Sequence, residues 1–165
     1  IIKMFFRIKK IKGREYAYIV ENSWKRKGSR QKVKGYIGRV YMPNLKHDVD
    51  FFKHFNIENA ESNLQSGDFA KIINDLAEWE ILKHVISKDE FLIDLANAKI
   101  EKNVKKVAFR INDGFMCSLT LRNLLEFKAE GDEENDGYRL ARAFVEAGIK
   151  VPQNVFVGLF GKLYK

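Results

Sequence analysis

The first 41 residues contain three segments whose side chains alternate with the two-residue period of a β-strand. The segments are FFRIKKIK at 5–12, REYAYIVEN at 14–22 and RQKVKGYIGRVY at 30–41. Their aromatic and β-branched residues favour strands. Gly13 predicts a tight turn between the first two segments, and residues 22–29 are predicted to form a longer basic loop between the second and third. Together these features predict an antiparallel meander of three strands.

After Pro43 the apolar spacing becomes helical. The strongest stripe runs through SGDFAKIINDLAEWEILKHVI at 66–86, where apolar residues recur every three or four positions. Ser87 and Glu90 have the spacing of a capping box, which predicts a short helix afterwards, although FLIDL at 91–95 also suits a strand. The other predicted helices are at 43–55, 120–129, 137–148 and 152–164.

Two apolar runs flank Asn112, Asp113 and Gly114, a sequence typical of a hairpin turn, so residues 104–119 are predicted to form a hairpin. A chain of 165 residues suits one domain, and two prolines leave little room for a flexible linker. The sequence therefore predicts an α+β fold. A basic β-meander at 1–41 packs on a mostly helical body at 42–165, which carries the additional hairpin.

Positive charge is concentrated in the predicted meander. Residues 1–41 hold thirteen Lys or Arg and only two acids, whereas residues 42–165 hold seventeen Lys or Arg and twenty acids. Segregated charge of one sign repels itself and is not needed for folding, but it speeds the capture of polyanions. The alternative is a solvated, solubilising surface, which usually mixes both signs. The near-absence of acids favours an anionic partner.

Duplex DNA is the partner that these residues favour most, because a ribbon of two or three strands fits the major groove and several cations can meet the phosphates. Arg7 and Lys9 share one face of the first strand, and Lys32 and Lys34 share one face of the third, so we expect one basic and one apolar face. The candidate contact residues are Arg7, Lys9, Arg14, Trp24, Lys25, Arg26, Lys27, Arg30, Lys32, Lys34 and Arg39.

Aromatic residues in the meander leave two questions open. Trp24, beside the cations of the predicted loop, either meets a base or covers the sheet. Tyr16, Tyr18 and Tyr36 on a sheet would also stack unpaired bases, which makes binding of RNA or another single strand an alternative.

The segment MFFRIKKIKGREYAYIVENSWKRKGSRQKVKGYIGRV at 4–40 resembles the basic N-terminal segment of some insertion-sequence (DDE-type) transposases and of archaeal proteins of unassigned role. The residues that carry the resemblance are Arg7, Lys9, Lys10, Gly13, Tyr16, Tyr18, Lys32, Tyr36 and Gly38. The resemblance implies a module that faces DNA and covers only about the first forty residues. It brings no transposase active site, because no triad of that kind is recognisable further along the chain.

A Mg²⁺-dependent nuclease is the enzymatic alternative. Asp113 precedes the sequence LLEFKA, in which Glu126 and Lys128 stand two apart, as in some metal-dependent nucleases. That active site requires LLEFK to be a strand. The leucine spacing and Thr120 favour a helix, which would direct Glu126 and Lys128 to different sides, so a non-enzymatic binder is expected.

Metal and cofactor sites are not expected. The loop GDEENDG at 131–137 begins like an EF-hand, but Ala143 stands where the bidentate Glu belongs, and Asp136 is predicted to cap the next helix instead. His47, His54 and His84 lack the spacing of a zinc site. Cys117 lies in an apolar run and is predicted to be a buried, reduced thiol in a cytoplasmic protein.

Two further expectations concern surfaces. No apolar stretch approaches the length of a membrane span, so no membrane partner is expected. Phe156, Phe160 and Tyr164 in the last predicted helix would form an apolar patch, which is a candidate surface for a homodimer.

Overall fold

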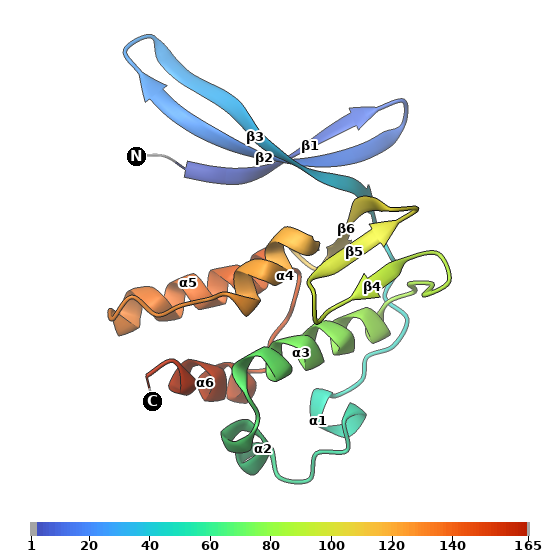
Figure 1. Cartoon of the computed structure of the whole chain (residues 1–165), viewed down its shortest axis with the longest axis vertical. Coiled ribbons are helices and arrows are strands. Elements are labelled where there is room, and N and C mark those ends of the chain that lie inside the picture. Colours follow the sequence, from blue (N-terminus) through green and yellow to red (C-terminus); the bar gives the residue numbers. More distant parts are fainter. Residues whose placement is uncertain (1–2, 165) are drawn as a thin grey trace.

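The computed structural model describes residues 3–164 and has an α+β fold in which the three-stranded meander is confirmed (Figure 1). The strands β1 (Lys3–Ile11), β2 (Arg14–Lys25) and β3 (Gly28–Tyr41) pair in antiparallel order. Lys12 and Gly13 form the first turn with φ of 50° and 76°, the left-handed conformation that two-residue hairpin turns favour.

The predicted loop at 22–29 is wrong. Strands β2 and β3 continue through this stretch as far as the pair Lys25 and Gly28, leaving only Arg26 and Lys27 as the turn. Gly28 has φ of +113°, which an L side chain rarely adopts. The high charge of this stretch suggested a loop, but charged side chains are compatible with a strand when both of its faces meet water.

The meander belongs to a larger mixed sheet. Strand β3 pairs in parallel with β6 (Lys105–Ile111), and β5 (Lys99–Lys102) and β4 (Leu92–Asp94) continue the sheet beyond it. Strand β7 (Gly114–Met116) completes the predicted hairpin with β6. Residues 92–94 are a strand rather than the helix predicted after the capping box at Ser87, because they pair with β5.

Six helices form most of the body of the described chain. They are α1 (Phe51–His54), α2 (Ala60–Ser66), α3 (Phe69–Lys83), α4 (Ser118–Leu125), α5 (Glu133–Glu146) and α6 (Gln153–Lys162). The helix predicted across 43–55 is wrong apart from its last turn. Residues 44–46 instead run antiparallel to the end of α3, where Lys46 donates its backbone N–H to the Lys83 carbonyl and Val85 donates to Asn44.

The prediction that Asp136 caps α5 is wrong, because this helix begins about one turn earlier. Asp132 is the N-cap of α5, and its carboxylate accepts a bond from the N–H of Asn135. Asp136 is fully buried and accepts bonds from the backbone of Glu130 and Gly131 and from the Arg139 and Tyr164 side chains. The Tyr164 hydroxyl is the main cause that lowers the pKa of Asp136. Desolvation, followed by this bond, raises the pKa of Tyr164 to about 12.

Two apolar clusters hold the sheet and helices together. The larger one fills the body between β5, β6 and the helices, with Ile73, Leu76, Phe109 and Leu140 almost fully buried. The smaller one joins the meander to the body. Its members are Ala17, Ile37, Val40, Ala108 and Cys117, with Phe6, Ile8, Ile19, Phe115 and Leu119 packed against them. Cys117 is buried as predicted, and burial raises the pKa of its thiol.

Gly38 is essential to the junction between β3 and β6. Its φ is +140°, and a Cβ at this position would lie 2.4 Å from the carbonyl oxygen of Lys106. Gly38→Ala should therefore lower the free energy of unfolding by about 3 kcal/mol or more, since strain and backbone overlap act together. Urea titration measures this. Gly161→Ala is the control, because a Cβ there meets no atom within 4 Å, and equal stability of the two variants would contradict the close approach.

Candidate nucleic-acid interface

Strand pairing divides the meander into two faces. One face carries Phe6, Ile8, Ala17 and Ile19, which pack against the body through the smaller apolar cluster. Residues on the opposite face are joined by the pairs Arg7 with Tyr18, Lys9 with Tyr16, Tyr18 with Tyr36, and Tyr16 with Arg39. We call these six residues the tyrosine face.

The Tyr36 ring contacts the rings of both Tyr16 and Tyr18. The ring centroids of Tyr18 and Tyr36 are 5.3 Å apart, and those of Tyr16 and Tyr36 are 6.5 Å apart. The Lys9 ammonium lies 4.7 Å from the centre of the Tyr18 ring. Tyr36 is 48% exposed, and partial burial, followed by its tyrosine neighbours, raises its pKa. The rings therefore form a joined aromatic surface with cations at its margin.

Neither acid of the meander lies on the tyrosine face. Glu15 pairs with Lys10 and Glu21 pairs with Lys32, on the face that packs against the body. The Glu21 carboxylate also accepts a salt bridge of 2.9 Å from Lys34. Within the described meander, the tyrosine face thus combines aromatic rings with Arg and Lys and carries no carboxylate to neutralise them.

The prediction of one basic and one apolar face is wrong. Lys32 lies on the side of Glu21, opposite Arg7 and Lys9, and Arg30 pairs with Ser23 on that same side. The cause is that the end of the meander extends past the body, so both of its faces meet water and both accept charge. Arg14 lies at the other hairpin, beside its partner Ile11, and is exposed.

Residues 22–31 form a two-stranded projection that we call the β2–β3 arm. Strand β1 pairs with β2 only as far as Asn22, so the stretch beyond it has no third strand. Figure 1 shows this arm leaving the body at the upper left, while the β1–β2 turn points away to the right. Lys25, Arg26, Lys27 and Arg30 are all exposed. The arm is therefore a charged ribbon with open access from several sides.

Trp24 lies near the tip of the arm, opposite Ser29. Its side chain is 76% exposed, which contradicts the interpretation of Trp24 as a hydrophobic cover on the sheet. It is on the same side of β2 as Tyr16 and Tyr18, because these positions are separated by even numbers of residues. Gln31 shares that side and accepts a hydrogen bond of 2.8 Å from Arg7.

The residues of the predicted nuclease site are not brought into one cavity. Helix α4 ends at Leu125, and Glu126 and Lys128 follow it, so LLEFK is not a strand. These two line a cleft of about 770 Å³ between the meander and α4 and α5, whereas Asp113 lines a separate hollow beside α5 and α6. Among residues 3–164, no group of three or more His, Cys, Asp or Glu side chains is arranged to hold a metal ion.

Two arginines that line the cleft beneath the meander form salt bridges with acids of the same cleft. Arg139 contacts Glu130 at 3.3 Å, and Arg142 contacts Glu146 at 2.9 Å. These pairs engage Arg139 and Arg142, two of the three cations that line the cleft, and a ligand would have to displace the acids from them. The cleft is therefore a weaker candidate for a polyanion than the meander.

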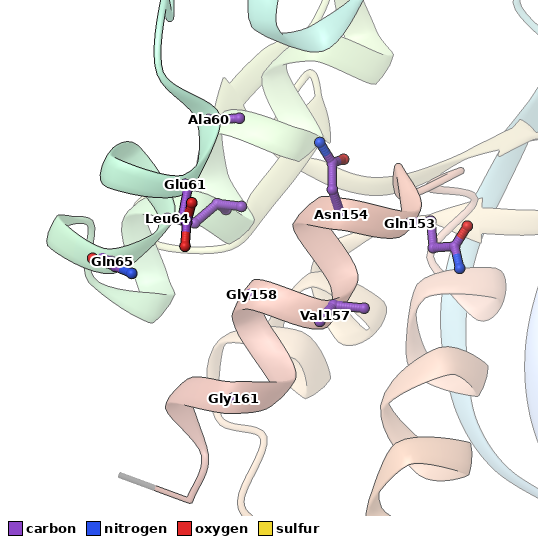
Figure 2. Close-up of a pocket in the computed structure, with 9 residues that line it drawn as sticks. All are labelled: Ala60, Glu61, Leu64, Gln65, Gln153, Asn154, Val157, Gly158 and Gly161. Carbon is purple, nitrogen blue, oxygen red and sulfur yellow. The ribbon is translucent and has the colours of Figure 1, made fainter.

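A second hollow of about 800 Å³ lies between α2 and α6 (Figure 2). Ala60, Leu64 and Val157 supply its apolar side chains, and Glu61 is the charged residue of its lining. Gly158 allows the two helices to approach, since a Cβ there would lie 3.0 Å from Leu64. The hollow brings together no acid–base pair or cation cluster, so it indicates no reaction.

The residues predicted to form a dimer surface are engaged within the fold. Phe156 and Phe160 are half-buried and stack with centroids 6.4 Å apart, and Tyr164 donates its hydroxyl hydrogen to Asp136. The homodimer stays a prediction. Within the part of the chain that the structure describes, no helix has the length and apolar character needed to span a membrane.

Comparison with known proteins gives no family for this chain. No protein-family model matches it, and neither the curated proteins nor the solved structures yield a match. The resemblance of the first forty residues to DNA-facing segments of transposases thus stays a prediction.

Proposed function

We propose that this chain is a non-enzymatic DNA-binding protein that contacts duplex DNA through the β2–β3 arm and the neighbouring cations of the meander. The observation that carries the proposal is the projection of a two-stranded, exposed ribbon with Lys25, Arg26, Lys27 and Arg30 around its tip. The major groove of B-DNA admits a ribbon of this kind, and the cations along it can meet phosphates on either side.

Two features support this function over a merely solubilising surface. Solubilising surfaces mix both signs of charge, whereas the two acids of the meander lie on its packed side and one of them is already paired with Lys34. An exposed tryptophan at the tip adds a large apolar surface that solubility does not require, and it suits contact with a base or a sugar.

The tyrosine face favours a second candidate, the binding of RNA or another single strand. Unpaired bases stack on aromatic rings that a sheet presents, and adjacent cations hold the backbone. The two candidates use different parts of the meander, so variants of the arm and of the tyrosine face separate them.

Salt dependence tests the proposed function. With four to six phosphate contacts, the affinity for a labelled duplex should fall with a log–log slope of roughly −4 to −5 against salt concentration. Fluorescence anisotropy between about 50 and 300 mM KCl measures this slope. Polyglutamate, which has negative charge but no bases or grooves, is the control competitor. A flat salt response, or no duplex binding at low salt, would contradict the proposal.

A further inference from the structure

We infer that the preferred ligand is a junction between double- and single-stranded DNA, called the fork below. The β2–β3 arm holds the duplex, and the tyrosine face holds unpaired bases of the adjoining single strand. This inference rests on the proposed function and adds a second subsite to it. It assigns a role to Tyr16, Tyr18 and Tyr36. These tyrosines have no role when the arm alone binds a duplex.

The tyrosine face has the chemistry of a stacking subsite. Tyr36 contacts the rings of Tyr16 and Tyr18, and about half of its own surface is accessible. Base stacking on aromatic side chains tolerates any base, since every base has a π-face. A continuous duplex offers its bases only as edges in the grooves, so this surface suits bases that have left the stack.

Charge on the tyrosine face suits the strand that carries those bases. Lys9 lies against the Tyr18 ring, and Arg7 and Arg39 occupy the cross-strand positions beside Tyr18 and Tyr16. Both acids of the meander are on the opposite face. A phosphate backbone that follows the rings therefore meets cations on both sides and no carboxylate among the described meander residues.

The two subsites lie on the same side of β2, and between them stand the buried Val20 and the hydrogen bond from Arg7 to Gln31. Trp24 and Tyr18 are on the same side of β2 and are six residues apart, which is about 20 Å in an extended strand. Six base steps of a stacked strand span a similar length, at about 3.4 Å each. A duplex held at the arm with a tail of about six nucleotides would therefore reach the rings, whereas a tail of one nucleotide would not.

Binding to three DNA ligands tests the inference. The ligands are a blunt duplex, the same duplex with a tail of six nucleotides, and the tail alone. We expect the tailed duplex to bind about ten- to a hundred-fold more tightly than the blunt duplex, which is the gain from stacking one or two bases. Tyr36→Ala should reduce the affinity for the tailed duplex towards the blunt value and leave the affinity for the blunt duplex unchanged.

Matched variants keep this test independent of folding. Tyr36→Phe retains the ring and should retain the gain from the tail. Tyr138→Ala removes a tyrosine that is 67% exposed on α5 and should change neither affinity. Thermal melting of each variant shows whether it is folded, and Tyr18→Ala provides a second substitution in the same face.

The outcomes separate this inference from the proposed function. Equal binding of blunt and tailed duplexes would overturn the fork and leave duplex binding intact. Absence of binding to any duplex would overturn both. Binding of the tail alone as tightly as the tailed duplex would also overturn the fork, because the duplex would then contribute nothing.

Discussion

Replacement of Lys25, Arg26 and Lys27 together by alanine is expected to weaken duplex binding about a hundred-fold at physiological salt. Each cation that meets a phosphate releases counterions, so the loss of three contacts should also reduce the salt slope by roughly 2.7 units. The three side chains are exposed at the tip of the arm, and their removal should leave the melting temperature almost unchanged. Anisotropy titrations at several salt concentrations measure both quantities.

A charge-matched variant makes this result specific. Lys46, Lys53 and Lys88 are exposed on the body, and their replacement by alanine removes the same total charge from a different surface. This control should retain nearly all of the affinity and the original slope. If both triple variants lost affinity equally, the effect would be one of net charge, and the arm would not be the contact surface.

Trp24→Ala is expected to weaken duplex binding by about ten- to a hundred-fold, because stacking or wedging of an aromatic side chain against a base is worth roughly 1–3 kcal/mol. The side chain is 76% exposed, so its loss should shift the melting temperature little. Added DNA should quench the Trp24 fluorescence. Trp79 should stay bright, since its ring is buried and its Nε1 donates to the Val49 carbonyl at 2.6 Å.

The controls for Trp24 address its size and its apolar character. Trp24→Phe keeps an aromatic ring and should keep part of the affinity. Val104→Ala changes a side chain that is 90% exposed in the turn between β5 and β6 and should have no effect on binding. A lower melting temperature with full affinity in Trp24→Ala would show that the tryptophan stabilises the arm and does not contact DNA.

The parts of the fold that depend on local sequence were predictable. The turn at Lys12 and Gly13, the hairpin turn around Asn112 and the apolar stripe of α3 are each determined by residues close together in the chain. The parallel pairing of β3 with β6 was not predictable, because it joins residues far apart and leaves no periodic signal. Strands β4 and β5 are too short to show alternation.

The tyrosine face was only partly predictable. Tyr16 and Tyr18 share a side of β2 by the two-residue period of a strand. Tyr36 joins them only because a bulge at Lys34 adds one residue to β3, which turns every later side chain to the other face. A second bulge at Ile37 brings Arg39 opposite Tyr16. Gly35 and Gly38 directly follow the two bulges, and a glycine inside a strand is a signal of a bulge, but it does not say which side chains change face, so the grouping of rings and cations could not be derived from spacing.

The parallel pairing of β3 with β6 also has a consequence for the order of folding. Residues 1–41 leave the ribosome before β6 has been made, and hairpins form within microseconds once their residues are free. The meander therefore has to wait, with its apolar face uncovered, until residues 107–109 supply the neighbouring strand and Cys117 and Leu119 cover the apolar face. During that interval the positive charge of the meander discourages self-association, so the cations proposed to bind DNA also protect the nascent chain.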